Sequence, residues 1–103
     1  MTVADQSHAS STKNYFIVKA PDGVDIAVQE AGNPAGSPII FVHGMLGGHA
    51  CWEKQVYSVD LSRHRLITFD LRGHGLSGKP QEGSFYSDCR RWADDLRTVI
   101  ETT

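Results

Sequence analysis

Two glycine-rich stretches hold most of the residues in this sequence that could do chemistry. The first covers residues 43–48 and contains His43 followed by Gly44, then Gly47 and Gly48. Glycines allow the backbone to turn sharply and to approach a bound molecule closely. This stretch therefore predicts a site loop, although the His43-Gly44 pair alone would also fit a simple tight turn between a strand and a helix.

The second stretch covers residues 70–80 and contains a weak match to a nucleotide-binding motif. Residues 73–78 have the G-x-G-x-x-G spacing with which dinucleotide-binding proteins hold a pyrophosphate at a helix N-terminus. Pro80 and Gly83 argue against a helix at this point. We therefore keep nucleotide binding only as the weaker alternative.

Ser77, in the same stretch, is considered separately as a nucleophile. A nucleophile elbow has the pattern G-x-S-x-G on a turn that leads from a strand into a helix. Lys79 stands where the last glycine is required, and the residues that follow have no helical pattern. We therefore expect Ser77 to be a loop residue whose hydroxyl binds local backbone.

A metal site is the third option, because several His and Cys side chains could act as ligands. Their spacing matches neither C-x-x-C nor H-E-x-x-H, so we expect no metal, and no other cofactor is implied. The cysteines are expected to be reduced and to pack as small apolar side chains. The possible ligands are His43, His49, Cys51, His64, His74 and Cys89.

The elements that position these loops begin with a hairpin. Residues 15–18 are aromatic or β-branched and predict a strand. The Pro-Asp-Gly sequence at 21–23 predicts a tight turn. Alternating apolar and polar residues at 24–29 predict a half-buried strand that returns antiparallel to the first.

Two further strands and a helix follow the hairpin. The apolar run at 39–43 predicts a strand buried on both faces, and residues 65–70 predict a second, mostly apolar strand. Between them, apolar residues at roughly helical spacing predict a helix over 51–61.

The last element is a helix with an apolar stripe from 89 to 100, with Ser87 as its N-cap and Asp88 in its first turn. The order β-β-loop-β-α-β-loop-α predicts an α/β fold with a parallel sheet, to which the hairpin adds an antiparallel N-terminal strand at one edge. Both glycine-rich loops then follow the carboxyl ends of strands, where open α/β sheets bind ligands.

Length and composition limit the classes of protein. With 103 residues, 40% of them hydrophobic, and a net charge of −2, the sequence predicts one small domain and no nucleic-acid surface. No apolar run is long enough to span a bilayer. Residues 1–13 predict a disordered polar tail without the apolar core of a signal peptide, so we expect a soluble, cytoplasmic protein without a membrane partner.

Together the two stretches resemble one known family. His43-Gly44-x-x-Gly47-x-x-x-x-Trp52, followed by Phe69-Asp70-x-Arg72-Gly73-His74-Gly75-x-Ser77, is similar to the N-terminal half of an α/β-hydrolase of the AB hydrolase-1 type. The hairpin and residues 93–96 look like the same family. The resemblance covers about residues 14 to 101 and implies an incomplete α/β-hydrolase sheet. It implies no particular substrate, because this fold hosts many chemistries.

The resemblance also implies roles for individual residues. The backbone N–H of Met45 would be one donor of the oxyanion hole, which stabilises the negative oxygen formed in acyl transfer. Leu46 stands where members similar to epoxide hydrolases carry Pro, which disfavours that branch. Trp52 would pack in the core. The residues that would shape the two loops are His43, Gly44, Gly47, Asp70, Arg72, Gly73 and Gly75.

Some of these roles have an expected mechanism. His43 would orient the first loop by hydrogen bonding, and it is not expected to be catalytic. Asp70 and Arg72 would brace the second loop, through an Asp-to-Arg ion pair or an Arg fork to backbone oxygens. Neither His43 nor His74 matches the position of the family's catalytic histidine.

The sequence ends before the family's catalytic machinery. The strand that carries the G-x-S-x-G elbow would follow Thr103, and the catalytic acid and histidine come later still. We therefore expect a fragment of an esterase-like hydrolase, or of a related hydrolase of a small substrate, that uses a covalent mechanism. Without the triad, this chain is expected to be inactive alone.

The predicted strand at 39–43 would be internal in the family's sheet order, 1-2-4-3-5. Here its outer edge would lack a neighbour, and an unpaired apolar edge is a template for pairing with another segment. We expect marginal stability alone, with either association at this edge or poor solubility. The alternative function is a non-catalytic α/β module that binds a partner through its open sheet edge.

Overall fold

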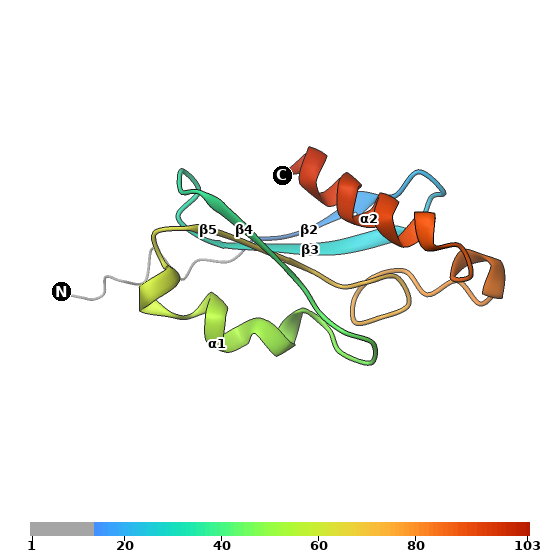
Figure 1. Cartoon of the computed structure of the whole chain (residues 1–103), viewed down its shortest axis with the longest axis horizontal. Helices are drawn as coiled ribbons and strands as arrows, with labels where there is room; N and C mark the ends of the chain where they lie inside the picture. The colour runs from blue at the N-terminus through green and yellow to red at the C-terminus, as the bar shows by residue number, and fades with distance from the viewer. Residues whose placement is uncertain (1–13) are drawn as a thin grey trace.

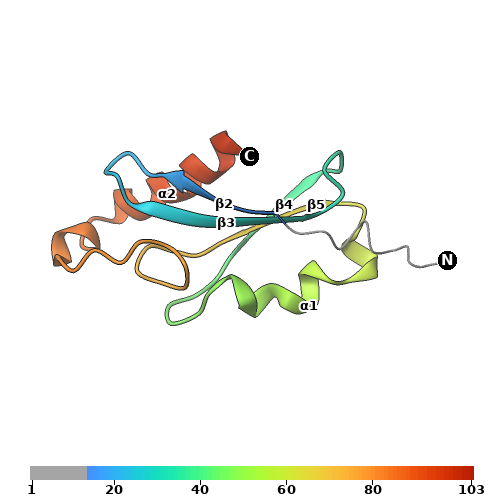
Figure 2. The same cartoon turned by 180° about the vertical axis from the view of Figure 1, so that it is seen from behind.

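The chain folds into a four-stranded mixed sheet with a helix on each face (Figure 1). The computed structural model describes residues 14–103, and the predicted tail at residues 1–13 lies outside the described residues. The view from behind shows the same layers, with α1 and α2 on opposite sides of the sheet (Figure 2). The elements are β2 (Asn14–Lys19), β3 (Asp25–Gly32), β4 (Pro38–Val42), η2 (His49–Trp52), α1 (Glu53–Val56), η3 (Val59–Leu61), β5 (Arg65–Phe69), η4 (Gly83–Phe85) and α2 (Cys89–Thr102), where η denotes a 3-10 helix.

The strand order is β2-β3-β5-β4, which confirms the predicted α/β class. β4 and β5 pair in parallel from Pro38↔Arg65 to Val42↔Phe69. β3 pairs antiparallel with β2 on one side and with β5 on the other. The hairpin thus lies at one edge of the sheet, as predicted, with β2 outermost and with β3 running opposite to its neighbours on both sides. The hairpin covers only one side of β3, which leaves the other side free to pair with β5.

The hairpin turn forms where it is predicted, at Pro21-Asp22-Gly23. Gly23 has φ +90°, a left-handed conformation that glycine adopts without steric cost. The strand that follows is more buried than its alternating pattern suggests, because both of its faces are covered. Gln29 can be buried on the second face because the hydroxyl of Thr68 donates to its Oε1 at 3.1 Å.

β4 is not buried on both faces, and this part of the sequence prediction is wrong. It is the last strand of the sheet, and its side chains are half-buried or exposed. β5 has a neighbour on each side and is buried from Leu66 to Phe69. The two strands have similar apolar sequences, so the number of neighbouring strands, and not hydrophobicity, sets their burial.

The helix predicted over 51–61 is broken into η2, α1 and η3. Ser58 interrupts it: its backbone is extended, and its hydroxyl accepts the N–H of Asp60, which begins η3 instead of continuing α1. A serine that binds nearby backbone in this way competes with helix formation. Trp52 packs as predicted, with its ring 5.1 Å from that of Phe41, beside the small core cluster that contains Val56.

α2 is the long helix that the sequence predicts, with a different cap. Asp88, not Ser87, is the N-cap, and its carboxylate accepts the N–H of Arg90 at 2.9 Å. The helix packs Val99 and Leu96 against one face of the sheet. The buried residues of this main core are Val18, Ala20, Val24, Ile26, Val28, Ile67, Phe69 and Val99.

The two cysteines differ from the prediction. Cys51 and Cys89 are free thiols, but both are exposed and do not pack as small apolar side chains. Cys51 lies in η2 and Cys89 is the first residue of α2, and both residues face solvent. In the described part of the chain, no helix has the length and apolar character needed to cross a bilayer.

Candidate functional site

Two loops meet beyond the carboxyl ends of the parallel strands β4 and β5. We call residues 43–48 the β4 loop and residues 70–80 the β5 loop. Three histidines make the polar contacts between them: His43 at the start of the β4 loop, His49 just after its end, and His74 in the β5 loop. The geometry of each contact fixes what the loops offer to a ligand.

His43 joins the first residues of the two loops and is buried. Its Nδ1 lies 2.6 Å from the carbonyl oxygen of Gly44, and its Nε2 lies 3.0 Å from the backbone N of Leu71. A carbonyl oxygen can only accept, so the proton is on Nδ1 and Nε2 accepts the Leu71 N–H. Both ring nitrogens are thus used in holding backbone, and neither is available as a base.

Asp70 is fully buried and receives donors from the β5 loop and from His49, the residue that follows the β4 loop. Oδ1 accepts the N–H of His49 at 2.5 Å, Oδ2 accepts the N–H of Leu76 at 2.9 Å, and the His49 ring Nδ1 lies 3.0 Å from both oxygens. Burial raises the pKa of this carboxyl, but the hydrogen bonds from Leu76 and His49 together outweigh burial and hold the pKa below its ordinary value. Asp70 is therefore a charged carboxylate whose two oxygens both accept hydrogen bonds, and it links the β5 loop to the end of the β4 loop.

At two positions of the β5 loop, only glycine fits, because another side chain lies too close for a Cβ atom. Gly75 has φ +52°, and a Cβ there would lie 2.4 Å from the carboxylate carbon of Asp70. Gly73 has φ +77°, and a Cβ there would lie 2.8 Å from the Tyr86 ring. Gly44, in contrast, has open space around it and no left-handed backbone.

The left-handed residue of the β4 loop is Leu46, with φ +67°. Its N–H donates to Nε2 of His74 at 3.0 Å, and the N–H of Gly47 donates to the carbonyl of Gly44 at 3.1 Å. Within residues 14–103 the N–H of Met45 makes no hydrogen bond, and the Met45 side chain is 70% exposed. The loop thus presents the unused N–H of Met45 directly before the bound N–H groups of Leu46 and Gly47.

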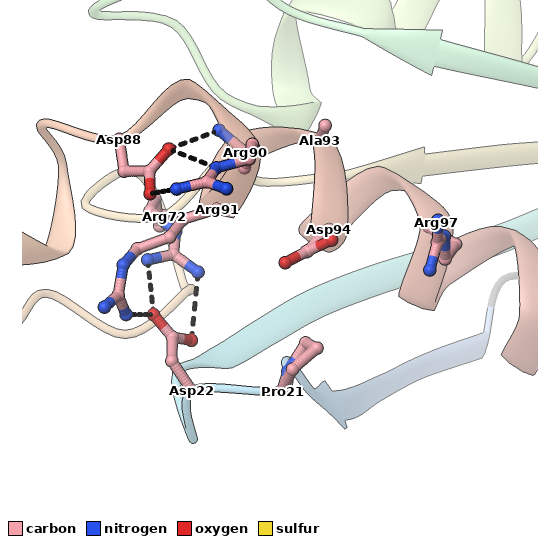
Figure 3. A pocket seen from close by; sticks show the side chains of 9 residues that line it. All are labelled: Pro21, Asp22, Arg72, Asp88, Arg90, Arg91, Ala93, Asp94 and Arg97. Atoms are coloured by element: carbon pink, nitrogen blue, oxygen red, sulfur yellow. Dashed lines mark hydrogen bonds and ion pairs between the residues drawn. The ribbon is translucent and has the colours of Figure 1, made fainter.

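Arg72 is buried in an ion-pair cluster, of which Figure 3 shows the contacts of Arg72 and Arg91 with Asp22. Its guanidinium binds Asp95 through two hydrogen bonds of 2.7 Å, Asp22 through bonds of 2.8 and 3.1 Å, and the carbonyl of Phe85 at 2.7 Å. The carboxylates that pair with Arg72 are thus those of Asp22 and Asp95, and not that of Asp70.

These contacts shift the pKa values of the ion pair in the direction of charge. The hydrogen bond with Asp95 raises the pKa of Arg72 although burial opposes it. The hydrogen bond from Arg72, and a further one from Arg91, hold the pKa of Asp22 well below its ordinary value although burial raises it. The adjacent cleft has a volume of about 570 Å³. It is lined by Arg72, by Pro21 and Asp22 of the hairpin turn, and by residues at the start of α2, with none from the β4 loop.

The sequence contained a signal for only one of the two partners of Arg72. Asp95 lies three residues after Trp92 and four before Val99, so an acidic residue occupies the apolar face of a helix. A charged residue at such a position needs a buried partner. Asp22 gave no such signal, because Asp is the residue expected in a Pro-Asp-Gly turn.

Ser77 is a structural residue. It is buried, and its hydroxyl accepts the N–H of Ala27 at 2.8 Å and donates to the carbonyl of Asp70. The Asp70 contact is local, as expected, whereas Ala27 is distant in sequence and ties the β5 loop to β3. No helix begins within residues 73–78, so the phosphate-binding geometry of the dinucleotide motif is absent there. Among residues 14–103, no three His, Cys, Asp or Glu side chains are grouped so as to hold a metal ion.

The sequence matches the family model of the alpha/beta hydrolase fold over residues 37–102, which is more than half of the chain. The chain belongs to the α/β-hydrolase fold family. The matched segment begins just before β4 and includes both loops and α2 of this α/β-hydrolase chain, whereas Asp22 and Ala27, which bind Arg72 and Ser77, precede it.

Several relatives are similar over most of this α/β-hydrolase chain. "Probable oxidoreductase EphD" of Mycobacterium tuberculosis is 39% identical over 84 residues, which are 82% of this chain and 14% of the relative. "AB hydrolase superfamily protein YisY" of Bacillus subtilis is 38% identical over 85 residues, which are 82% of this chain and 30% of the relative.

Solved structures show the same relationship. A "putative aryl esterase" from Burkholderia cenocepacia superposes with a TM-score of 0.85 and 62% identity over 86% of this chain and 33% of that protein. The epoxide hydrolase VrEH1 from Vigna radiata superposes with a TM-score of 0.76 at 24% identity, which shows a shared fold. The chain thus spans a third or less of the length of these relatives.

Proposed function

We propose that this chain is the N-terminal part of an α/β-hydrolase that cleaves a small ester, or a related acyl substrate, through a covalent intermediate. The observation that carries the proposal is the unused Met45 N–H, held at the carboxyl end of the parallel strands between two anchored residues. The 62% identity with a protein named as an aryl esterase favours esters among the substrates that relatives suggest.

In this proposal, the Met45 N–H is one of the oxyanion-hole donors. Acyl transfer develops a negative charge on the carbonyl oxygen, and a donor that is already oriented stabilises it without reorganisation. One such donor lowers the barrier by about 3–4 kcal/mol. Of the loop-shaping residues predicted from the sequence, His43 and Asp70 supply this orientation: His43 binds the N–H of Leu71, and Asp70 binds the N–H of His49, directly after the β4 loop.

The remaining catalytic groups come from outside residues 14–103. Ser77 is buried with its hydroxyl engaged at both ends, and the ring nitrogens of His43 and His74 are engaged with backbone groups. None of them is free to attack a substrate or to take its proton. We therefore propose that the 103-residue chain is inactive alone, and that the nucleophile, acid and base lie in a further segment of the enzyme.

The tests use the backbone donor itself, in the full-length protein that carries this chain. Met45→Pro removes the N–H, and Met45→Ala, the matched control, keeps it while removing most of the side chain. We expect the Pro variant to lose roughly 10²–10³-fold in kcat for p-nitrophenyl acetate, and the Ala variant to lose far less. Equal losses in the two variants would contradict the donor role.

Inactivity of the isolated chain has its own test. A fluorophosphonate probe, which labels activated serines, is expected to leave the 103-residue chain unlabelled and to label the full-length enzyme. Stoichiometric labelling of the isolated chain that disappears in Ser77→Ala would show that the chain contains its own nucleophile.

A second candidate role is pairing through β4, favoured by its position at the open end of the sheet. Val42 is exposed, and the residues before it are half-buried apolar side chains with no strand on their outer side in the described residues. In the hydrolase proposal a further strand of the enzyme covers this edge. In the alternative proposal, a partner protein covers it and there is no catalysis. A cytoplasmic location stays a prediction of the sequence.

A further inference from the structure

We propose that His74 is a positioning residue that sets the direction of the Met45 N–H by holding the next residue, Leu46, in a left-handed backbone conformation. This inference rests on the proposed oxyanion role of Met45. It assigns a task to a histidine that is neither in the family's catalytic position nor part of a metal site in the described residues.

The first step concerns Leu46. A residue with a branched side chain rarely adopts φ near +67°, because its Cβ crowds the backbone, so something in the fold must hold it there. Packing does not, since the Leu46 side chain is 97% exposed. Two hydrogen bonds remain. The N–H of Gly47 donates to the carbonyl of Gly44 at 3.1 Å and closes a local turn around Leu46, and the N–H of Leu46 donates to Nε2 of His74 at 3.0 Å, which ties that turn to the other loop.

The second step concerns His74 itself. Its Nδ1 lies 2.9 Å from the carbonyl oxygen of Arg72, which can only accept, so Nδ1 carries a proton, and its Nε2 faces the N–H of Leu46, which can only donate. This tautomer leaves the Nε2 lone pair free to accept the Leu46 N–H. Its other ring neighbour is His43, at 5.2 Å between ring centroids.

The third step concerns what holds the histidine. Arg72, whose carbonyl receives the Nδ1 proton, is fixed by its bidentate pairs with Asp95 and Asp22. Arg72 therefore connects the buried ion pair, made by its side chain, to the two hydrogen bonds of His74, the first of which is made to the Arg72 backbone carbonyl. The peptide N–H of Leu46 is fixed by His74, and the neighbouring Met45 N–H, which has no partner of its own, is oriented through the backbone that the two residues share.

The test uses two substitutions of His74, chosen to separate the hydrogen bond with Leu46 from the hydrogen bond with the Arg72 carbonyl. His74→Gln places an amide oxygen near the position of Nε2 and can still accept the Leu46 N–H. His74→Asn can still donate to the Arg72 carbonyl from its shorter side chain, but has no acceptor within reach of Leu46. His64→Asn is the matched control, because His64 lies before β5, at the far end of that strand from both loops, and no hydrogen bond of its ring is seen within residues 14–103.

The first readout is NMR of the full-length protein that carries this chain, with ¹⁵N-labelled histidine and leucine. We expect a scalar coupling across the hydrogen bond between Leu46 N and His74 Nε2, and ring ¹⁵N shifts typical of the Nδ1–H tautomer. The Leu46 amide should exchange at least tenfold faster in His74→Asn, and near the wild-type rate in His74→Gln and His64→Asn. An Nε2–H tautomer, or an unchanged Leu46 amide in His74→Asn, would overturn the proposal.

The second readout separates this inference from the proposed function. Loss of an oriented donor should lower kcat for p-nitrophenyl acetate roughly tenfold to a hundredfold in His74→Asn, with little change in KM and with recovery in His74→Gln. If the wild type is an active esterase and His74→Asn keeps its kcat, the positioning role is wrong while the hydrolase proposal stands. If the wild type has no esterase activity, the hydrolase proposal fails, and the NMR readout still decides whether His74 holds Leu46.

Discussion

The Arg72 cluster and the β4 loop use polar groups in opposite ways. In the cluster, the buried guanidinium makes five hydrogen bonds within the protein. Its carboxylate partners are Asp22, in the turn between β2 and β3, and Asp95, on α2. In the β4 loop, His43 and Leu46 are anchored while the Met45 N–H between them is unused. A saturated buried network stabilises the fold, whereas an unused donor on a fixed loop is available to a ligand.

The largest effect is expected from breaking the cluster. Arg72→Ala leaves the buried Asp95 carboxylate without a cation, and removing one member of a buried pair typically costs about 3–5 kcal/mol. We expect chemical unfolding to show a loss of that size, or no folded protein at all. Arg90→Ala is the control, because Arg90 pairs with Asp88 at the surface, and its unfolding midpoint should hardly change. Equal effects of the two substitutions would show that the cluster does not stabilise the fold.

A smaller effect is expected from a substitution at the joint between the two loops. Gly75→Ala must place a Cβ against the Asp70 carboxylate in a left-handed backbone, so we expect a loss of about 1–3 kcal/mol or more in the free energy of unfolding. Gly44→Ala is the matched control in the other loop, where no atom lies within 4 Å of the added Cβ. A stable Gly75→Ala protein would mean that the joint can rearrange, and that the loops are less rigid than the proposed donor requires.

The cluster also predicts an acid dependence of stability. Hydrogen bonds from Arg72 lower the pKa of Asp22 in the folded state, so its contribution to stability is complete above the ordinary value of 3.8. That contribution is lost as the pH falls below this value and the carboxylate takes up a proton. We expect the free energy of unfolding to decrease as the pH is lowered below about 4. Asp22→Asn should be less stable at pH 7 and should show a shallower decrease, and a parallel curve for the variant would contradict this assignment.

Local signals in the sequence predicted much of the fold. The Pro-Asp-Gly turn, the apolar runs of β4 and β5 and the stripe of α2 each depend on neighbouring residues, and each element is found. Properties that depend on distant residues were missed. β4 is half-exposed because of its place in the sheet, Gln29 is buried because Thr68 reaches it, and Asp22 pairs with Arg72 fifty positions away.

The candidate site shows the same division. The motif residues predicted that the two loops form one site, and in the structure His43 binds the N–H of Leu71 while Gly75 lies against Asp70. No local signal in the sequence indicates that Leu46, rather than one of three neighbouring glycines, takes the left-handed conformation. Leu46 is the third residue of the turn closed by the hydrogen bond from Gly47 to Gly44, and its own N–H is bound by Nε2 of His74, which lies 28 positions further along the chain.

The smallest effect on stability is expected at Leu46. Glycine adopts φ +67° without crowding and keeps the N–H, so Leu46→Gly removes backbone strain from the folded state. Glycine also increases the conformational entropy of the unfolded chain, which offsets that gain. Leu46→Gly should therefore change the free energy of unfolding by less than about 1 kcal/mol. Leu46→Pro has neither the N–H nor access to this φ, and it should release the loop from His74. Unfolding curves and the Met45 amide shift test the pair. If the Pro variant kept the wild-type Met45 environment, the loop would be held by something other than the hydrogen bond to His74, and the contrast with the Arg72 cluster would no longer separate function from stability.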